Sequence, residues 1–197
     1  MPAYDTQLLL KHLLTQGVAW APDQEIIYRD QVRHTYKDMY ERVLRLGAAL
    51  GSLGVQQGTK VGVIEWDSHR YLEMYFGIPG IGAVLHTINP RLAPEDLAYT
   101  LGHAEDEVLI FHEDFWPLVE RLRPRLSCIR KYVLITDKGE KPETMGVDGE
   151  YEALLAAATP LPELPDLDER TQATLSYTTG TTGRPKGVYF TQRQLTL

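Results

Sequence analysis

The chain has 197 residues, which is long enough for one sizeable domain and short for two. Hydrophobic residues make up 43% of the sequence and charged residues 24%, a composition that excludes a mostly disordered chain. Twenty Lys and Arg against 27 Asp and Glu give a formal net charge of −7, so we expect no nucleic-acid partner and no general attraction to anionic lipid.

Cysteine usage and hydropathy indicate where in the cell the protein is expected. The single cysteine, Cys128, has no partner for an internal disulfide or for a thiolate metal site. No apolar run approaches the roughly 20 residues that span a bilayer, and the N-terminus lacks the basic start and apolar stretch of a signal peptide. We therefore expect no membrane span and a cytoplasmic location.

The N-terminal third predicts a helix, a hairpin and a second helix. Leucines on one side of residues 6–17 indicate an amphipathic helix. Residues 25–29 and 32–36 are short apolar runs on either side of a two-residue turn, which indicates a hairpin. Thr35 followed three residues later by Asp38 is a capping box that would begin the second helix.

The centre of the chain alternates short apolar runs with segments of helix length. This alternation is typical of right-handed βαβ units, so we predict a doubly wound α/β fold with a mostly parallel sheet. Asp67 is a plausible cap for the first of these helices, and Pro94 suits the first position of the second. The expected strands are 60–66, 83–86, 108–111 and 132–135, and the expected helices begin near 67, 94 and 115.

Beyond residue 135 the pattern changes. Residues 137–149 are polar and predict an exposed loop, and residues 151–158 predict a short helix. Three prolines then indicate an extended connector over residues 159–170. A further strand is expected at residues 173–177, directly before the most informative segment of the sequence.

Residues 177–188 carry most of the recognisable chemistry. Their glycines let the backbone turn its N–H groups toward an anion, their threonines supply hydroxyls, and Lys186 supplies a positive charge suited to phosphate. Pro185 precedes the lysine and Gly187 follows it, whereas the Walker loop has glycine before the lysine and serine or threonine after it. We predict a phosphate-binding loop of another kind. A plain threonine- and glycine-rich surface turn is the alternative, and it does not account for so long an ordered motif.

The order of these residues resembles the signature of the acyl-adenylate-forming enzymes, which include acyl-CoA synthetases, luciferases and peptide-synthetase adenylation domains. That signature is an aromatic residue followed by Thr-Ser/Thr-Gly-Ser/Thr-Thr-Gly-x-Pro-Lys-Gly-Val, and residues 177–188 match it throughout. The resemblance covers roughly residues 20–197, so that residues 1–197 would be the N-terminal portion of an AMP-binding domain. The resemblance is also carried by residues 58–63, 80–92 and 95–99. Within this family, residues 85–92 and 103–106 look most like those of medium- and long-chain fatty acyl-CoA synthetases.

The resemblance implies a two-step ligase reaction. A fatty acid carboxylate attacks the α-phosphate of Mg-ATP and releases pyrophosphate, and coenzyme A then displaces AMP to give a thioester. Lys186 would be the catalytic residue, as an electrostatic stabiliser of the phosphates, and Thr178 would also approach Mg²⁺. The residues implied to contact the nucleotide phosphates are Thr178, Thr179, Gly180, Thr181, Thr182, Gly183 and Lys186.

The chain also departs from the family pattern. Family members continue well beyond this loop with a Tyr-Gly-x-Thr-Glu segment for the metal, an Asp for the ribose, a hinge and a lysine for adenylation. None of these follows here, and Gln192 stands where many relatives have histidine. We expect this chain alone to be catalytically silent. A non-catalytic adenylate-fold binding module and an aryl- or amino-acid-activating member remain alternatives. An unpaired sheet edge would favour a homo-oligomer or another partner.

Two other patterns predict structural roles. His69, His86, His103 and His112 lack the i, i+4 spacing of helical metal ligands, so packing or exposed roles are expected for them. Residues 77–82 contain three glycines but do not match Gly-x-Gly-x-x-Gly, which excludes a dinucleotide fingerprint. We expect these glycines to allow close packing at the end of a helix.

Overall fold

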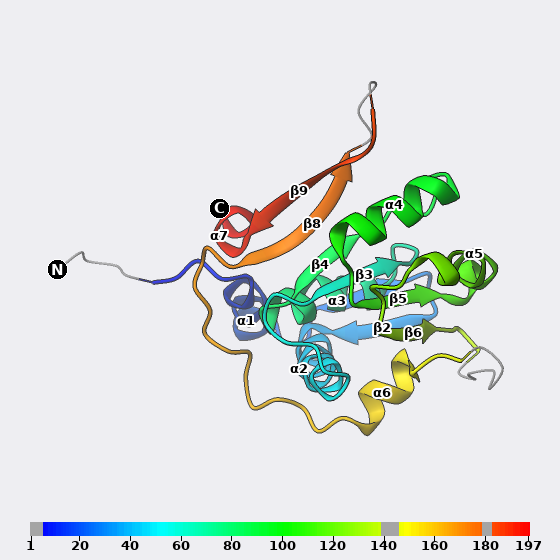
Figure 1. The fold of residues 1–197 in the computed structure, drawn as a ribbon. Helices are drawn as coiled ribbons and strands as arrows, with labels where there is room; N and C mark the ends of the chain where they lie inside the picture. Colours follow the sequence, from blue (N-terminus) through cyan, green and yellow to red (C-terminus); the bar gives the residue numbers. More distant parts are fainter. Residues whose placement is uncertain (1–5, 139–145, 179–182) are drawn as a thin grey trace.

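The computed structural model describes residues 6–138, 146–178 and 183–197. Within these residues the chain forms an α/β fold in which helices cover both faces of one large sheet (Figure 1). The helices are α1 (Leu10–Trp20), α2 (Tyr36–Ser52), α3 (His69–Gly80), α4 (Pro94–Ala104), α5 (Trp116–Leu122), α6 (Tyr151–Ala157) and α7 (Gln192–Thr196). The strands are β1 (Glu25–Tyr28), β2 (Val32–Thr35), β3 (Lys60–Ile64), β4 (Val84–Thr87), β5 (Val108–His112), β6 (Lys131–Ile135), β7 (Gly149–Glu150), β8 (Gln172–Thr178) and β9 (Lys186–Thr191).

The order of strands in the large sheet is β7-β6-β5-β3-β4-β8-β9. Neighbouring strands from β7 to β8 are parallel, and β9 pairs antiparallel with β8 at the edge. Figure 1 shows β8 and β9 as a long ribbon that extends away from the other strands. The prediction of a doubly wound, mostly parallel sheet is confirmed.

The strands are apolar on both faces because both faces are covered. Alternate residues of β5 point in opposite directions, so Val108 and Ile110 pack with α2, α3 and α6, whereas Leu109 and Phe111 pack with α4 and α5. Figure 1 shows the same two layers, with α2 and α6 below the sheet and α4 above it. The two buried clusters explain why the expected strands are continuous apolar runs.

The N-terminal elements also agree with the sequence pattern. Strands β1 and β2 form the expected antiparallel hairpin. Thr35 Oγ1 accepts a hydrogen bond from the backbone N–H of Asp38, and the Asp38 carboxylate accepts one from the backbone N–H of Thr35. This capping box begins α2 at the expected residue. The first helix runs from Leu10 to Trp20, so it begins four residues later and ends three residues later than expected.

Three local predictions are wrong. Ser68, not Asp67, caps α3, since the Ser68 hydroxyl accepts from the N–H groups that follow it. The single helix expected to begin near residue 115 is split into η1 (Glu113–Phe115), α5 and η2 (Arg123–Arg125), and α5 ends before Pro124, which has no N–H to continue an α-helix. The loop expected over 137–149 ends earlier, because Gly149 and Glu150 pair with β6 as β7; residues 139–145 lie outside the described residues.

The glycines of α3 allow the close packing expected of them. A Cβ built on Gly77 would lie 2.6 Å from Leu46 Cδ2, and one built on Gly80 would lie 2.9 Å from Leu164 Cδ1. Leu164 belongs to the segment 159–170, which has neither helix nor strand and leads along the molecule from α6 to β8 (Figure 1). None of the described helices is both long and apolar enough to cross a membrane.

Candidate functional site

The carboxyl ends of the parallel strands β3, β4 and β8 enclose a cavity of about 340 Å³. Ligands of open α/β sheets bind at this edge, because the loops that follow the strands converge there. Its lining includes the residue after β3, the last residues of β4, Ser176 and Tyr177 of β8, and the segment from Ile88 to Leu92. The predicted phosphate-binding loop leaves β8 at the same edge.

Glu65 is a buried carboxyl group at this edge of the sheet. It directly follows β3, is 5% exposed, and its Oε2 has no hydrogen-bond partner among the described residues. Burial raises the pKa of Glu65 to about 7, against the opposing effects of a hydrogen bond with Ser68 and the positive charge of Arg70. A carboxyl group with such a pKa exchanges a proton near neutral pH.

The two ends of the predicted loop are paired strands. Thr178 is the last residue of β8 and pairs with Lys186, the first residue of β9. Cross-strand partners project from the same face of a sheet, so the side chains of Thr178 and Lys186 leave the ribbon on the same face. Both residues are exposed, and among the residues that the structure describes none forms an ion pair with Lys186. This lysine is therefore available to an anionic ligand.

The remaining predicted phosphate contacts are placed only in part. Gly183 is described and has a φ of 115°, a conformation that glycine tolerates and other residues rarely adopt. The predicted phosphate contacts Thr179, Gly180, Thr181 and Thr182 lie outside the described residues.

The residue at the base of the loop, Tyr177, packs among groups that the sequence pattern did not connect with it. Its hydroxyl lies 2.7 Å from Nδ1 of His103 on α4, and its ring centroid lies 5.1 Å from that of His86 on β4. His86 Nδ1 in turn lies 2.6 Å from Oδ2 of Asp106, which is fully buried. Burial raises the pKa of the Tyr177 hydroxyl further above its ordinary value, which already lies well above neutral pH.

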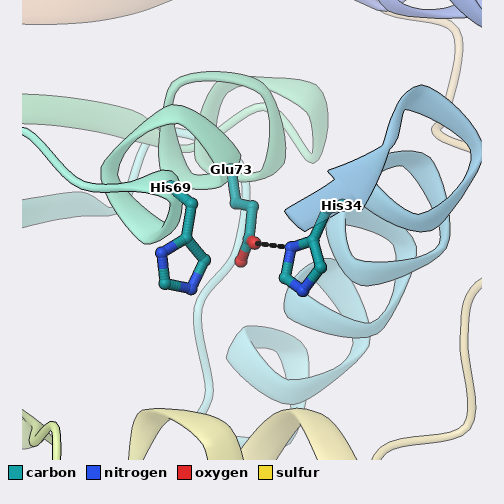
Figure 2. Close-up of side chains that lie close together, drawn as sticks. All are labelled: His34, His69 and Glu73. Atoms are coloured by element: carbon teal, nitrogen blue, oxygen red, sulfur yellow. Dashed lines mark ion pairs between the residues drawn. The ribbon is translucent and has the colours of Figure 1, made fainter. Parts of the chain in front are cut away.

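A second polar cluster lies between α2, α3 and the β1–β2 hairpin. His34, His69 and Glu73 place ligand-type atoms within 4.8 Å of one another, and Figure 2 shows the His34–Glu73 contact, 3.9 Å long. The Glu73 carboxylate, however, accepts hydrogen bonds at 2.7 and 3.1 Å from Arg42 and at 2.8 Å from Tyr151. A metal ion here would compete with a guanidinium for both oxygens, so these contacts favour a structural ion-pair network.

Comparison with known proteins identifies the family. The family model described as AMP-binding enzyme matches residues 14–197. The chain is 41% identical over 197 residues to a long-chain-fatty-acid–CoA ligase of Thermus thermophilus, an alignment that covers 98% of this chain and 35% of the relative. The chain belongs to the AMP-binding enzyme family. Its resemblance to acyl-adenylate-forming enzymes, inferred from residues 177–188, is confirmed.

Another relative and a solved structure to which the chain is similar are also CoA ligases. A 3-methylmercaptopropionyl-CoA ligase of Ruegeria pomeroyi is 44% identical over 155 residues, which are 78% of this chain and 29% of the relative. The crystal structure of the anthranilate CoA ligase AuaEII in complex with anthranoyl-AMP has a TM-score of 0.87 and 28% identity, with 98% of this chain and 37% of that one covered. The chain spans about a third of the length of the curated relatives it matches.

Sequence reasoning missed three features of this site. Glu65 gave no signal, because its burial depends on the elements packed around it. His86 and His103 were expected to have packing or exposed roles, and the pattern did not indicate which residues they contact. Asp106 belongs to the segment 103–106 that resembles fatty acyl-CoA synthetases, and that likeness was the available hint.

Proposed function

We propose that this chain supplies the phosphate-binding part of an AMP-forming acid–CoA ligase. In the first step the carboxylate oxygen of the acid bonds to the α-phosphorus of ATP, and the bond from that phosphorus to the bridging oxygen of pyrophosphate breaks. In the second step the sulfur of coenzyme A bonds to the acyl carbon, the acyl–phosphate bond breaks, AMP leaves, and the thiol proton passes to solvent or a base. Membership of the family is the observation that carries this proposal.

The residues at the base of the loop suit the first step. This step brings a carboxylate up to a polyphosphate, so fixed positive charge and hydrogen-bond donors stabilise its transition state. Lys186, exposed beside Thr178 on paired strands, would hold phosphate oxygens. Lysine acts here as a charge, since it neither gives nor takes a proton in bonding phosphorus to oxygen.

The donor chemistry at Thr178 fits Mg²⁺ as one ligand among several. Mg²⁺ prefers oxygen ligands, keeps several waters and is commonly held by substrate phosphates. An exposed hydroxyl beside a phosphate-binding lysine meets that pattern, although one hydroxyl does not hold the ion without the phosphates. When bound, Mg²⁺ neutralises phosphate charge.

A fatty acid is the proposed acid. The support is the likeness to the Thermus thermophilus ligase and to a medium-chain-fatty-acid–CoA ligase of Ectopseudomonas oleovorans, which is 31% identical over 197 residues. The AuaEII structure, whose ligand is anthranoyl-AMP, keeps an aryl acid as the second candidate.

Binding and turnover are tested separately. Calorimetric titration of this chain with Mg-ATP tests the loop, with Lys186→Ala as the variant and Lys138→Ala, another highly exposed lysine, as the control. Carboxylate-dependent exchange of labelled pyrophosphate into ATP, with the complete polypeptide that the gene encodes, tests the reaction with palmitate, octanoate and benzoate. Exchange with none of these acids would contradict the proposed ligase, and exchange with benzoate alone would favour an aryl acid.

A further inference from the structure

Helix α4 contacts both ends of the predicted phosphate-binding loop. His103 of α4 shares a 2.7 Å hydrogen bond with the hydroxyl of Tyr177, which directly precedes Thr178. One turn earlier on the same helix is Tyr99, and the guanidinium carbon of Arg184 lies 5.1 Å from the centroid of its ring. Arg184 stands two residues before Lys186. Tyr99 and His103 also contact each other, with ring centroids 5.2 Å apart.

Tyr177 is held on further sides. Its ring lies 5.1 Å from the ring of His86, whose Nδ1 is bonded to the buried Asp106. Opposite Tyr177 on β9 stands Gly187, where a Cβ would lie 3.3 Å from the tyrosine Cζ, so glycine leaves room for the ring. The side chain that begins the loop therefore has a fixed place on the α4 face of the sheet.

The opposite face of the same ribbon carries the predicted phosphate ligands. Neighbouring residues of a strand point to opposite faces, so Thr178 and Lys186 project away from α4 while Tyr177 projects toward it. Strand β9 is exposed along most of its length and lies at the sheet edge, so its own packing restrains the ribbon weakly. In addition to the pairing of β8 with β4 and the contact of Tyr177 with His86, the contacts of Tyr177 and Arg184 with α4 hold the part of the ribbon that carries Thr178 and Lys186.

We propose that Tyr99 and His103 of α4 are positioning residues for nucleotide binding, and that they act by fixing the two ends of the phosphate-binding loop through Arg184 and Tyr177. The proposal rests on the proposed function, because it assumes that Thr178 and Lys186 meet the nucleotide. If α4 already holds Thr178 and Lys186 in place, these two residues lose less conformational freedom when the phosphates bind, which raises affinity without a further contact to the ligand.

The variants separate a hydrogen bond from general packing. His103→Leu removes the bond to Tyr177, whereas His103→Asn keeps a hydrogen-bonding atom near the position of Nδ1. Tyr177→Phe removes the same bond from the other side and keeps the ring. Tyr99→Phe keeps an aromatic face for Arg184, and Tyr99→Leu removes it.

Two readouts are measured on the chain. The first is amide hydrogen exchange at 176–178 and 186–188 without ligand, with the amides of the central strand β3 as internal reference. The second is Mg-ATP affinity by calorimetry. We expect His103→Leu, Tyr177→Phe and Tyr99→Leu each to speed exchange at these two segments and to weaken affinity about twofold to tenfold, the range of one lost hydrogen bond or cation–π contact. His103→Asn and Tyr99→Phe should stay within about twofold of wild type, and the double variant His103→Leu/Tyr177→Phe should be no weaker than the single ones.

Each other result overturns the proposal. Unchanged exchange at 176–178 and 186–188 in His103→Leu means that α4 does not hold the loop. Faster exchange there and equally at β3 means that the variants loosen the whole fold. Faster local exchange with unchanged Mg-ATP affinity means that the contacts do not serve the nucleotide. If the wild-type chain binds no Mg-ATP while local exchange still responds, the proposed phosphate site itself fails, and the positioning role fails with it.

Discussion

Replacing Glu65 with glutamine should change how the stability of this protein depends on pH. Glu65 is almost fully buried and its pKa is raised from 4.5 to about 7 by that burial. Between these values the unfolded chain releases the proton while the folded chain keeps it. The folded state then binds more protons than the unfolded state, so the free energy of unfolding falls as pH rises from about 4.5 to about 7.

The size of this effect follows from the two pKa values. A pKa difference of this size is worth about 3 kcal/mol of unfolding free energy, at about 1.4 kcal/mol for each pKa step. His69, also buried, acts in the opposite direction: burial, followed by the charges of Arg70 and Arg42, lowers its pKa from 6.5 to about 4. Between these two values the unfolded chain binds this proton and the folded chain does not. His69 therefore makes the free energy of unfolding rise as pH rises from about 4 to about 6.5.

The two buried groups therefore mask each other in the wild-type protein, and a variant is needed to separate them. Urea unfolding followed by tryptophan fluorescence gives the free energy of unfolding of Glu65→Gln and wild type at several pH values from 5 to 7.5. Relative to wild type, Glu65→Gln should gain about 2–3 kcal/mol across this range. The exposed Glu120→Gln variant is the control and should show a constant difference. A Glu65→Gln difference that stays constant within about 0.5 kcal/mol would refute the burial argument.

Three further substitutions test the site and the packing. Lys186→Ala should weaken Mg-ATP binding to this chain at least tenfold (a charge-assisted contact is worth about 1.5–3 kcal/mol), and an unchanged titration would contradict the phosphate role. Glu73→Ala removes one of the carboxylates that pair with Arg42 and should lower the free energy of unfolding, measured by urea unfolding, by about 3 kcal/mol. The control Glu41→Ala, which breaks the more exposed ion pair with Arg45, should change it by less than about 1 kcal/mol. Gly77→Val should lower the free energy of unfolding by about 1–3 kcal/mol, because the new side chain would overlap Leu46. Gly51→Val is the control, since nothing lies within 4 Å of a Cβ at Gly51; equal stability of the two variants would show that α2 and α3 do not approach closely at Gly77.

Much of the fold could be predicted from local sequence because the physical causes are local. The capping box at Thr35 and Asp38 and the proline at the start of α4 act within one helical turn. Strands such as 108–112 read as apolar runs because helices cover both of their faces. Boundaries were harder to predict: Asp67 and Ser68 are both residue types that cap helices, and in the structure Ser68 caps α3.

The candidate site was predictable where its chemistry is contiguous in sequence. Residues 177–188 carry glycine, threonine and lysine in one ordered motif, and that order alone identified the family later confirmed by comparison. The roles of Lys186 and Thr178 in that motif stay predictions. Their cross-strand pairing, however, follows from the β8–β9 register, which no local pattern revealed.

The sequence by itself determined the class of fold, the order of most helices and strands and the predicted phosphate-binding motif, since each depends on residues close together along the chain. Tertiary structure decided which distant side chains meet: Tyr177 with His103, 74 residues earlier, and His86 with Asp106. It also decided that Glu65 is buried at the end of the central strand β3. Such contacts depend on strand order, register and the helix that crosses each face, and burial then sets the pKa values that composition cannot supply.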